Sequence, residues 1–435
     1  MKNDSLLGYH IQDSRELDKV IKNKIVDVII TSPPYWNLKD YGTDEQIGLG
    51  QKYDSYLKEV VELFDKCYDI TKESGSMWVV IDTIKKNGEM IPLPFEFVSK
   101  LKDYQLNKIK TGMRDKEQKW HLQDIIIWQK NKTLPWSHKG KVRKIFEYVL
   151  FFSKSKKHFK YYIDNIRDPE NLKKWAISHP ERYNPRGKVP TQIWEFNLIT
   201  QGWTNKWIRH ACPFPIELVE RILHLTTDEN DVVFDPFAGS GSVLAQAHTM
   251  NRKYIGFDLN TSYKKMFYNQ VLPKVVEMQS NLEKSGLTLK KKQENLMKDI
   301  IGRRKLKYAR EIIRRASKNN PEIQENVGYI FVDGLKNKLM TCDIYYILKN
   351  KSVNKINFED VLNQQQKITL LRKYTLDAKI HVTHILPHKF SDQDDFYYYP
   401  NSQFKAYKDK IKIAQHLGNQ TELLPDIISN ICVSN

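Results

Sequence analysis

One βαβ pattern in the second half of the chain constrains the fold more than any other feature. The apolar run 232–234 leads into a turn with Gly239 and Gly241, then a helical pattern and a second apolar run that ends at Asp258. Strand, glycine turn, helix and a second strand with a terminal acid form the first unit of a nucleotide-binding fold. The glycines let the backbone approach a ligand closely, and the acid suits a ribose diol. The pattern therefore predicts a doubly wound α/β sheet.

The turn is more specific than a bare Gly-x-Gly pair. It reads Asp235-Pro236-Phe237-Ala238-Gly239-Ser240-Gly241 and lacks the third glycine of the dinucleotide fingerprint. Asp235 stands at the strand end, where it would meet a cationic or amino-bearing ligand. The helix after the turn offers free backbone amides and a positive dipole end to a ligand carboxylate.

A second strand-end loop lies some two hundred residues earlier. The β-branched run 26–30 reads as a buried parallel strand, and Thr31-Ser32-Pro33-Pro34-Tyr35-Trp36 follows it. The two prolines fix φ and remove two N–H donors, so the carbonyls of Ser32 and Pro33 stay available to a ligand. A hydroxyl, a rigid acceptor and the flat face of Tyr35 could together hold a planar heterocycle by its amino group. For this loop alone, a proline-rich turn that merely closes a strand is an equal alternative.

Together the two loops resemble those of the DNA amino-methyltransferases that use S-adenosylmethionine, in the permuted order called the β class. The resemblance covers roughly residues 5–275 and includes further motifs in the same order. These are Ile11-Gln12-Asp13-Ser14, the segment from Asp124 to Trp128, Pro135, Arg143, Glu147 to Lys154, and His210-Ala211-Cys212-Pro213-Phe214-Pro215. Gln12, Ala211 and Cys212 depart from the family pattern.

The resemblance implies a Rossmann-like, mostly parallel sheet with one antiparallel edge strand, in which the catalytic strand precedes the cofactor strand. It assigns the catalytic role to Ser32, Pro33, Pro34 and Tyr35. S-Adenosyl-L-methionine is the expected cofactor, and its expected contacts are Asp13, Phe214, Asp235, Phe237, Gly239, Gly241 and Asp258. The expected reaction is direct transfer of a methyl group to the exocyclic amino group of a flipped base in double-stranded DNA.

The target atom is cytosine N4 or adenine N6. Family members with Asp at the first motif position mostly modify adenine, whereas those with Ser before Pro-Pro-Tyr are often cytosine enzymes, so Ser32 favours cytosine. An RNA methyltransferase and an inactive DNA-binding module remain lesser alternatives. A cognate restriction endonuclease is an expected genetic partner, and homodimerisation is left open.

Charge and cysteine content agree with a nucleic-acid enzyme. The formal net charge is +18, and clustered Lys and Arg gain affinity by displacing counterions from phosphate. The four cysteines are far apart and form no C-x-x-C pair, so neither a metal ribbon nor a disulfide framework is expected. The chain shows no apolar signal core and no membrane-length apolar run, which favours a cytoplasmic protein without a membrane partner.

Four segments are expected along the chain. Residues 1–153 form the catalytic half and 210–280 the cofactor half of the methyltransferase domain. The intervening residues 154–209, basic and aromatic, are predicted to recognise the target sequence. Residues 281–435 form a basic, mainly helical extension, with thirteen Lys or Arg against four Asp or Glu over 283–318.

Two histidine-containing stretches within the extension, 381–388 and 416–419, faintly resemble an H-N-H nuclease core. In that resemblance His384 would polarise a water molecule, and His388 or a late Asn would meet a metal. A purely structural role is favoured for them, and no metal site is predicted.

Overall fold

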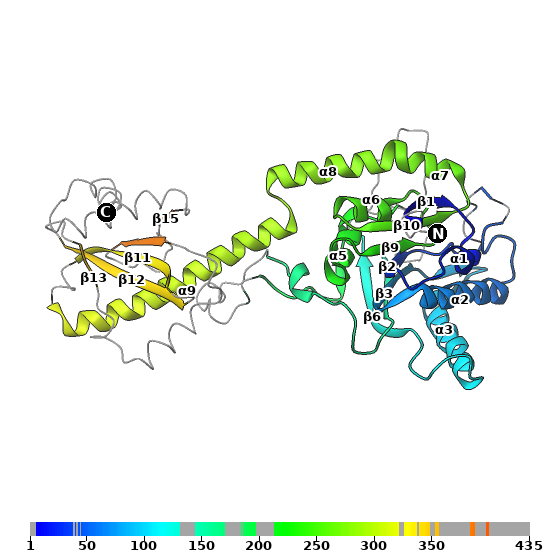
Figure 1. The fold of residues 1–435 in the computed structure, drawn as a ribbon, viewed down its shortest axis with the longest axis horizontal. Helices are drawn as coiled ribbons and strands as arrows, with labels where there is room; N and C mark the ends of the chain where they lie inside the picture. Colours follow the sequence, from blue (N-terminus) through cyan, green and yellow to red (C-terminus); the bar gives the residue numbers. More distant parts are fainter. Residues whose placement is uncertain are drawn as a thin grey trace. The chain divides into compact units, whose positions relative to one another are not determined.

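The computed structural model divides the chain into two compact units (Figure 1). The first contains Met1–Arg167 and Val189–Thr288, and the second contains Asp168–Lys188 and Leu289–Asn435. The structure describes residues 6–37, 40, 42–43, 45–130, 144–169, 184, 186–196, 213–321, 326–336, 339–348, 353–355, 383–387 and 397–399.

The first unit is built on a mixed sheet of eight strands. In spatial order these are β1 (Gly8–Ile11), β10 (Lys253–Asp258), β9 (Val232–Asp235), β2 (Val26–Thr31), β3 (Thr71–Ile81), β7 (Phe146–Ser153), β6 (His121–Gln129) and β8 (Ile193–Glu195). The pairs from β1 to β3 are parallel, β7 is antiparallel to both of its neighbours, and β8 pairs with β6 in parallel. The predicted doubly wound, mostly parallel sheet is therefore confirmed.

The predicted position of the antiparallel strand is wrong. β7 is internal, because β6 and β8 extend the sheet beyond it. β8 comes from the irregular segment 154–209, whose short apolar run 193–194 gave no clear strand signal. Of that segment, residues 170–183, 185 and 197–209 lie outside the described residues.

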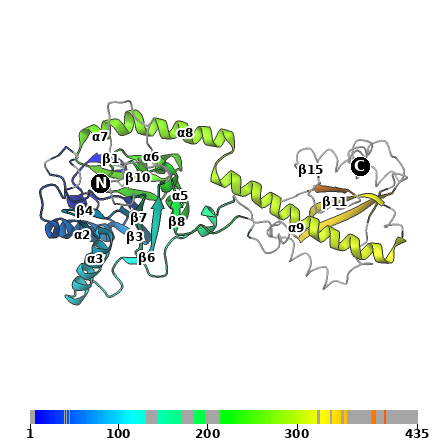
Figure 2. The same ribbon diagram turned by 180° about the vertical axis from the view of Figure 1, so that it is seen from behind.

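Helices cover both faces of the sheet, as side-chain alternation along β2 requires (Figure 2). Ile29 packs into a core with α2 (Tyr53–Ile70) and α3 (Leu93–Lys110), whereas Val28 and Ile30 pack on the other face with α5 (Ile216–Thr226) and α6 (Ser242–Thr249). Successive strand residues point to opposite faces, so a strand buried on both sides reads as a continuous apolar run. The remaining elements of this unit are η2 (Ser14–Glu16), α1 (Leu17–Val20), β4 (Ile84–Lys86), β5 (Glu89–Ile91), η3 (Ile163–Ile166), α7 (Thr261–Met266), η5 (Phe267–Val271) and α8 (Leu272–Ser285).

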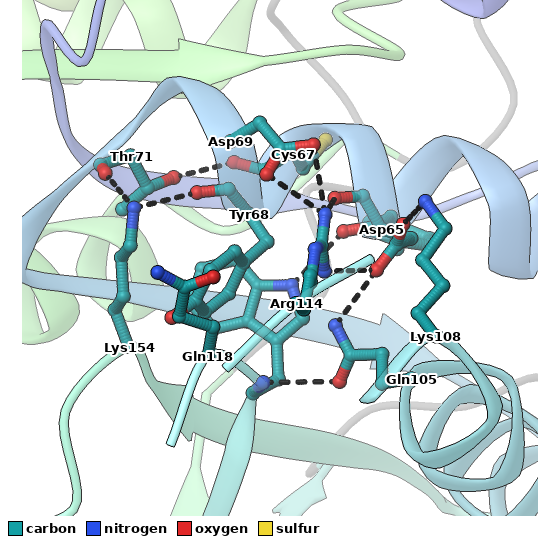
Figure 3. A network of polar contacts seen from close by, with 12 residues as sticks. Asp65, Cys67, Tyr68, Asp69, Thr71, Gln105, Lys108, Arg114, Gln118 and Lys154 are labelled. Carbon is teal, nitrogen blue, oxygen red and sulfur yellow. Dashed lines mark hydrogen bonds and ion pairs between the residues drawn. The ribbon is translucent and has the colours of Figure 1, made fainter. Parts of the chain in front are cut away.

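A buried ionic network locks the carboxyl end of α2 to α3 (Figure 3). The Asp65 carboxylate, 1% exposed, accepts hydrogen bonds from Gln105 Nε2 at 3.0 Å, from Lys108 Nζ at 2.5 Å and from Arg114 Nη1. The same guanidinium reaches the exposed Asp69 at 2.8 Å. Since each buried charge has an opposite charge and several hydrogen bonds, the network fixes the helix pair instead of destabilising it.

The buried Lys154 caps the carboxyl end of α2. Its ammonium donates to the carbonyls of Tyr68, at 2.8 Å, and Thr71, and it lies 4.4 Å from the Tyr68 ring centroid. A cation at a helix carboxyl end satisfies free carbonyls and interacts favourably with the helix dipole. Burial lowers the pKa of Lys154 to about 8.

The second unit contains a helix and an antiparallel sheet. The helix α9 (Leu289–Asn319) matches the expected basic helix. The sheet has the order β13 (Val353–Lys355), β12 (Leu339–Leu348), β11 (Asn326–Lys336), β14 (Thr383–Pro387) and β15 (Tyr397–Tyr399). The expected helical extension is therefore present, but it carries a sheet that was not predicted.

The histidine stretches of this unit fall largely outside the described residues. The backbone of His384 belongs to β14, whereas His381, His388, His416 and Asn419 are not among the residues described. Within the described parts of the chain, no helix is long and apolar enough to span a membrane.

Candidate active site

The two predicted loops meet because their strands are neighbours. β2 and β9 pair in parallel through Val28 with Val233 and Ile29 with Phe234, so both carboxyl ends reach the same edge of the sheet. There the Thr31 hydroxyl donates to the Asp235 carboxylate at 2.7 Å. Ligands of open α/β sheets bind at this edge.

A cavity of about 380 Å³ opens at this edge. Nine of the eleven predicted site residues line it: Asp13, Ser32, Pro34, Tyr35, Phe214, Asp235, Phe237, Gly239 and Asp258. Pro33 is buried, and neither it nor Gly241 lines the cavity. The cavity is large enough for a nucleoside-sized ligand.

Backbone amides hold the carboxylate of Asp258, which lines the cavity. It accepts hydrogen bonds from Gly239 N at 2.9 Å and from Asn260 N at 2.8 Å. The Gly239 carbonyl in turn accepts a hydrogen bond from the buried Tyr9 phenol at 2.7 Å. Burial raises the pKa of Asp258, and these amides counteract the rise. A carboxylate held in this way retains lone pairs for the hydroxyls of a ribose.

Asp235 also lines the cavity, and its side chain is buried. Its Oδ1 accepts hydrogen bonds from Thr31 Oγ1 and, at 3.0 Å, from Phe237 N. Burial raises its pKa to about 7, although both hydrogen bonds favour the ionised form. A cationic ligand nearby would stabilise the ionised carboxylate.

Gly241 has a structural reason for lacking a side chain. Its φ is +78°, and a Cβ there would lie 2.3 Å from Cδ2 of Phe267. The expected role, a close approach to the cofactor, is therefore not needed to account for this glycine. It immediately precedes α6, whose first residue, Ser242, does line the cavity.

In the loop after β2, which also lines the cavity, Pro34 and Tyr35 are held by hydrogen bonds with neighbouring elements. The Tyr35 phenol donates to Glu147 Oε2 at 3.2 Å, and the Pro34 carbonyl accepts from the Tyr56 phenol at 2.9 Å. Burial holds the pKa of Tyr35 well above its ordinary value, so the phenol stays protonated at neutral pH. The loop therefore presents a neutral aromatic ring and a hydroxyl.

The predicted contact Asp13 is engaged within the protein. Its carboxylate pairs with Arg15 at 2.6 Å, and the same guanidinium reaches Glu59 of α2 at 2.9 Å. The neighbouring Ser14 hydroxyl donates to the Pro236 carbonyl, which joins the segment after β1 to the glycine turn. Asp13 thus lines the cavity, and its ion pair with Arg15 links this part of the cavity wall to α2.

Several lining residues were not predicted as site residues: Gln46, Ile47, Trp128, Glu147, Asn260 and Tyr263. Trp128 and Glu147 belong to motif segments identified in the sequence, and they face each other in the β6–β7 register. Gln46 and Ile47 belong to the loop 36–52, whose turn and charge signals without periodicity favour an active-site loop next to the target base but single out neither residue. Among the residues that the structure describes, no three His, Cys, Asp or Glu are placed to hold a metal ion.

Comparison with known proteins gives the family. A family model described as DNA methylase matches residues 26–269, and a second, for D12 class N6 adenine-specific DNA methyltransferases, matches residues 217–383. Type II methyltransferase M.Cfr9I of Citrobacter freundii is 29% identical over 261 residues, which cover 57% of this chain and 81% of the relative.

Two solved structures are also similar. One is the cytosine-N4-specific PvuII DNA methyltransferase, with a TM-score of 0.46, 18% identity and coverage of 63% of this chain and 92% of that one. The other is a putative DNA modification methylase from Thermus thermophilus in complex with S-adenosyl-L-methionine, with a TM-score of 0.40, 24% identity, and coverage of 62% and 95%. Since the DNA methylase model spans 244 of the 435 residues, more than half of the chain, this protein belongs to that family, the N4/N6 amino-methyltransferases of DNA.

Proposed function

We propose that the enzyme transfers the methyl group of S-adenosyl-L-methionine to N4 of a cytosine flipped out of double-stranded DNA. The observation that carries this proposal is the shared cavity. The Ser-Pro-Pro-Tyr loop follows β2 and the Asp235–Gly241 turn follows β9, these two strands are parallel neighbours, and residues of both loops line the same cavity. A methyl donor and an amino acceptor must lie side by side for direct transfer.

The cofactor supplies an electrophilic methyl group on a positively charged sulfur. The residues around Asp235 fit such a group. Asp258 would accept hydrogen bonds from the ribose hydroxyls, and the amino end of α6 would face the carboxylate. Phe214 and Phe237 offer apolar surface in the same cavity. The buried Asp235 would be ionised beside a cation, since an opposite charge favours the charged form.

The loop after β2 would hold the target base. An amino nitrogen inside a base stack cannot be reached by the methyl donor, so the base must leave the duplex. Tyr35 would stack on it, and Ser32 Oγ with the Pro33 carbonyl would accept hydrogen bonds from its amino group. These acceptors would draw the nitrogen lone pair out of conjugation and toward the methyl group, with no covalent intermediate on the enzyme.

Cytosine is favoured because Ser32 occupies the first motif position. Adenine N6 is the second candidate, since the model for N6 adenine-specific enzymes matches residues 217–383. The relative M.Cfr9I is a Type II methyltransferase. We propose that the present enzyme protects DNA against a cognate restriction endonuclease. We also propose that residues 154–209 select the DNA sequence.

Product analysis tests the target atom. Unmodified DNA is treated with the purified protein and S-adenosylmethionine, hydrolysed to nucleosides and analysed by mass spectrometry. The expected product is N4-methyldeoxycytidine, formed by the wild type and lost in Tyr35→Ala. N6-methyldeoxyadenosine as the sole product would contradict the cytosine assignment, and no methylated nucleoside at all would contradict the reaction.

A further inference from the structure

Tyr9 is a buried phenol that contacts the glycine turn from outside the cavity. It lies on β1, paired with Gly256 of β10, and is 1% exposed. Its hydroxyl donates to the Gly239 carbonyl at 2.7 Å, across 230 positions of sequence. Gly239 lines the cavity, whereas Tyr9 does not. Tyr9 therefore acts on a ligand only indirectly, and its phenol is joined to the cavity wall at Gly239.

Gly239 is held on both sides of its Cα. Its amide donates to Asp258 Oδ2 at 2.9 Å, and its carbonyl accepts the Tyr9 phenol. The φ angle of Gly239 is +51°, in the left-handed region that favours glycine. Because glycine has more backbone freedom than any other residue, these two hydrogen bonds, and not a side chain, fix its conformation. Asp258 is the carboxylate expected to bind the ribose, so the conformation of Gly239 also affects the placement of this carboxylate.

The Gly239 carbonyl depends on the Tyr9 phenol for its hydrogen bond. The glycine is buried, and no second donor to its carbonyl is found among the residues that the structure describes. The Tyr9 ring lies among apolar side chains, with the Phe267 ring centroid 5.5 Å away. A buried carbonyl that loses its donor carries the full cost of having left water. Loss of the phenol would therefore favour a rearranged turn in which this carbonyl finds another partner.

A second hydroxyl from the same stretch of chain also binds the turn. Ser14 Oγ donates to the Pro236 carbonyl. The edge strand β1 pairs in parallel with β10, and the two hydroxyls reach carbonyls that lie 222 and 230 positions later in the sequence. The first strand and the residues after it therefore brace the turn in addition to completing the sheet.

We propose that Tyr9 is a positioning residue for the cofactor: its phenol fixes Gly239, and Gly239 in turn holds Asp258 in the orientation that binds the ribose of S-adenosylmethionine. This inference rests on the proposed function for the role of Asp258. Burial raises the pKa of Tyr9 well above its ordinary value, so the phenol keeps the hydrogen that this link needs at neutral pH. Because Tyr9 does not line the cavity, its loss should affect cofactor binding and not the transfer step.

Calorimetric titration of S-adenosylmethionine into Tyr9→Phe tests the proposal without reference to turnover. The variant keeps the ring and its packing and loses only the hydroxyl. The Kd should rise about 3- to 10-fold, the factor expected for one hydrogen bond, while kcat at saturating cofactor should stay within about twofold of the wild type. An unchanged Kd, or a fall in kcat with no change in Kd, would overturn the proposal.

Tyr56→Phe is the matched control. Tyr56 is also fully buried, and its phenol also donates to a backbone carbonyl, but this carbonyl, that of Pro34 at 2.9 Å, belongs to the loop after β2. Both variants lose a phenol–carbonyl hydrogen bond, so urea unfolding should show similar losses of stability. Only Tyr9→Phe should weaken cofactor binding. Equal rises in Kd for the two variants would mean a general loosening of the domain and would refute the role of Tyr9.

A double-mutant cycle shows whether Tyr9 acts through Asp258. In Asp258→Ala the carboxylate that Gly239 holds is gone, so the further change Tyr9→Phe should alter Kd less than about twofold. Equal effects of Tyr9→Phe in both backgrounds would refute the route through Asp258. If Asp258→Ala binds no cofactor, the comparison with Tyr56→Phe decides whether Tyr9 positions the cofactor.

Failure of the proposed function looks different from failure of this inference. If the wild type binds no S-adenosylmethionine, or methylates no base amino group, the proposed function fails. If the wild type is active and Tyr9→Phe binds the cofactor equally well, only the role of Tyr9 fails.

Discussion

At the scale of single residues, the site combines polar groups that are satisfied within the protein with a few that remain for ligands. Asp258 and Asp235 are both held by backbone amides, but only Asp235 has a pKa raised to about 7. Burial of the Asp235 carboxylate without a nearby cation lowers the stability of the folded protein, and a bound cationic ligand would restore that stability.

Asp235→Asn is therefore expected to stabilise the ligand-free protein at neutral pH. A carboxyl whose folded-state pKa lies above the unfolded value holds a proton that the unfolded chain has released, so stability falls as pH rises from about 4 to 7. The amide keeps the hydrogen bonds from Thr31 and Phe237 but does not titrate. Urea unfolding measures the free energy of unfolding of the variant and of the wild type, and the difference between them should grow by about 2–3 kcal/mol in favour of the variant from pH 5 to pH 8. A difference that does not change with pH would contradict the raised pKa of Asp235.

At the scale of elements, α2 links the core to the site. Near its amino end Tyr56 fixes the Pro34 carbonyl, and at its carboxyl end Asp65 is locked to Arg114 and Lys108 (Figure 3). The helix therefore transmits the rigidity of the α2–α3 pair to the loop that holds Ser32 and Tyr35.

Asp65→Ala should lower the free energy of unfolding by about 3–5 kcal/mol, because Lys108 loses its partner and the buried Arg114 keeps only the exposed Asp69 as a counter-charge. Asp69→Ala is the matched control, since Asp69 pairs with the same Arg114 but is 61% exposed. Its loss should cost less than about 1 kcal/mol. Equal costs in denaturant unfolding would mean that the buried network does not anchor α2.

The strands that carry the site were predictable because their local patterns agree with the fold, whereas the edge strand β8 was not. The strands β2 and β9 are apolar runs ended by loops with distinctive residues, and parallel pairing alone brings Ser32 and Asp235 to one edge. Glu147 was not predicted as a site residue, because its contact with Tyr35 depends on the long-range pairing of β7 with β3, which has no local pattern. Gly241 was predicted to let the backbone approach the cofactor. In the structure its close neighbour is Phe267 of η5, a residue that is far away in the sequence.

At the scale of the whole molecule, the second unit shows where sequence patterns stop being sufficient. The runs of β11 and β12 are rich in β-branched and aromatic residues and are separated by only two residues, which is a hairpin signal. The partner β14, however, begins 35 residues after Leu348, and such long-range pairing has no local pattern. The basic helix α9 was predictable because its charge run is continuous.

We expect this second unit to contribute phosphate contacts. Removal of residues 289–435 should leave the affinity for S-adenosylmethionine unchanged but reduce the salt dependence of DNA binding. Each lost phosphate contact lowers the slope of log K against log salt by about 0.9. Titrations of a labelled duplex at several salt concentrations should show a slope smaller by about 3 or more. Identical slopes would exclude the extension from the DNA interface.

The central claim is that one cavity brings the methyl donor and the target amino group together, and label transfer tests it most directly. The protein is incubated with methyl-labelled S-adenosylmethionine and either duplex DNA or RNA of the same sequence, alongside Ser32→Ala. We expect label in the DNA with the wild type, a loss of about 10-fold or more in the variant, and little label in RNA. Labelled RNA with unlabelled DNA, or equal rates for Ser32→Ala and wild type, would contradict the account.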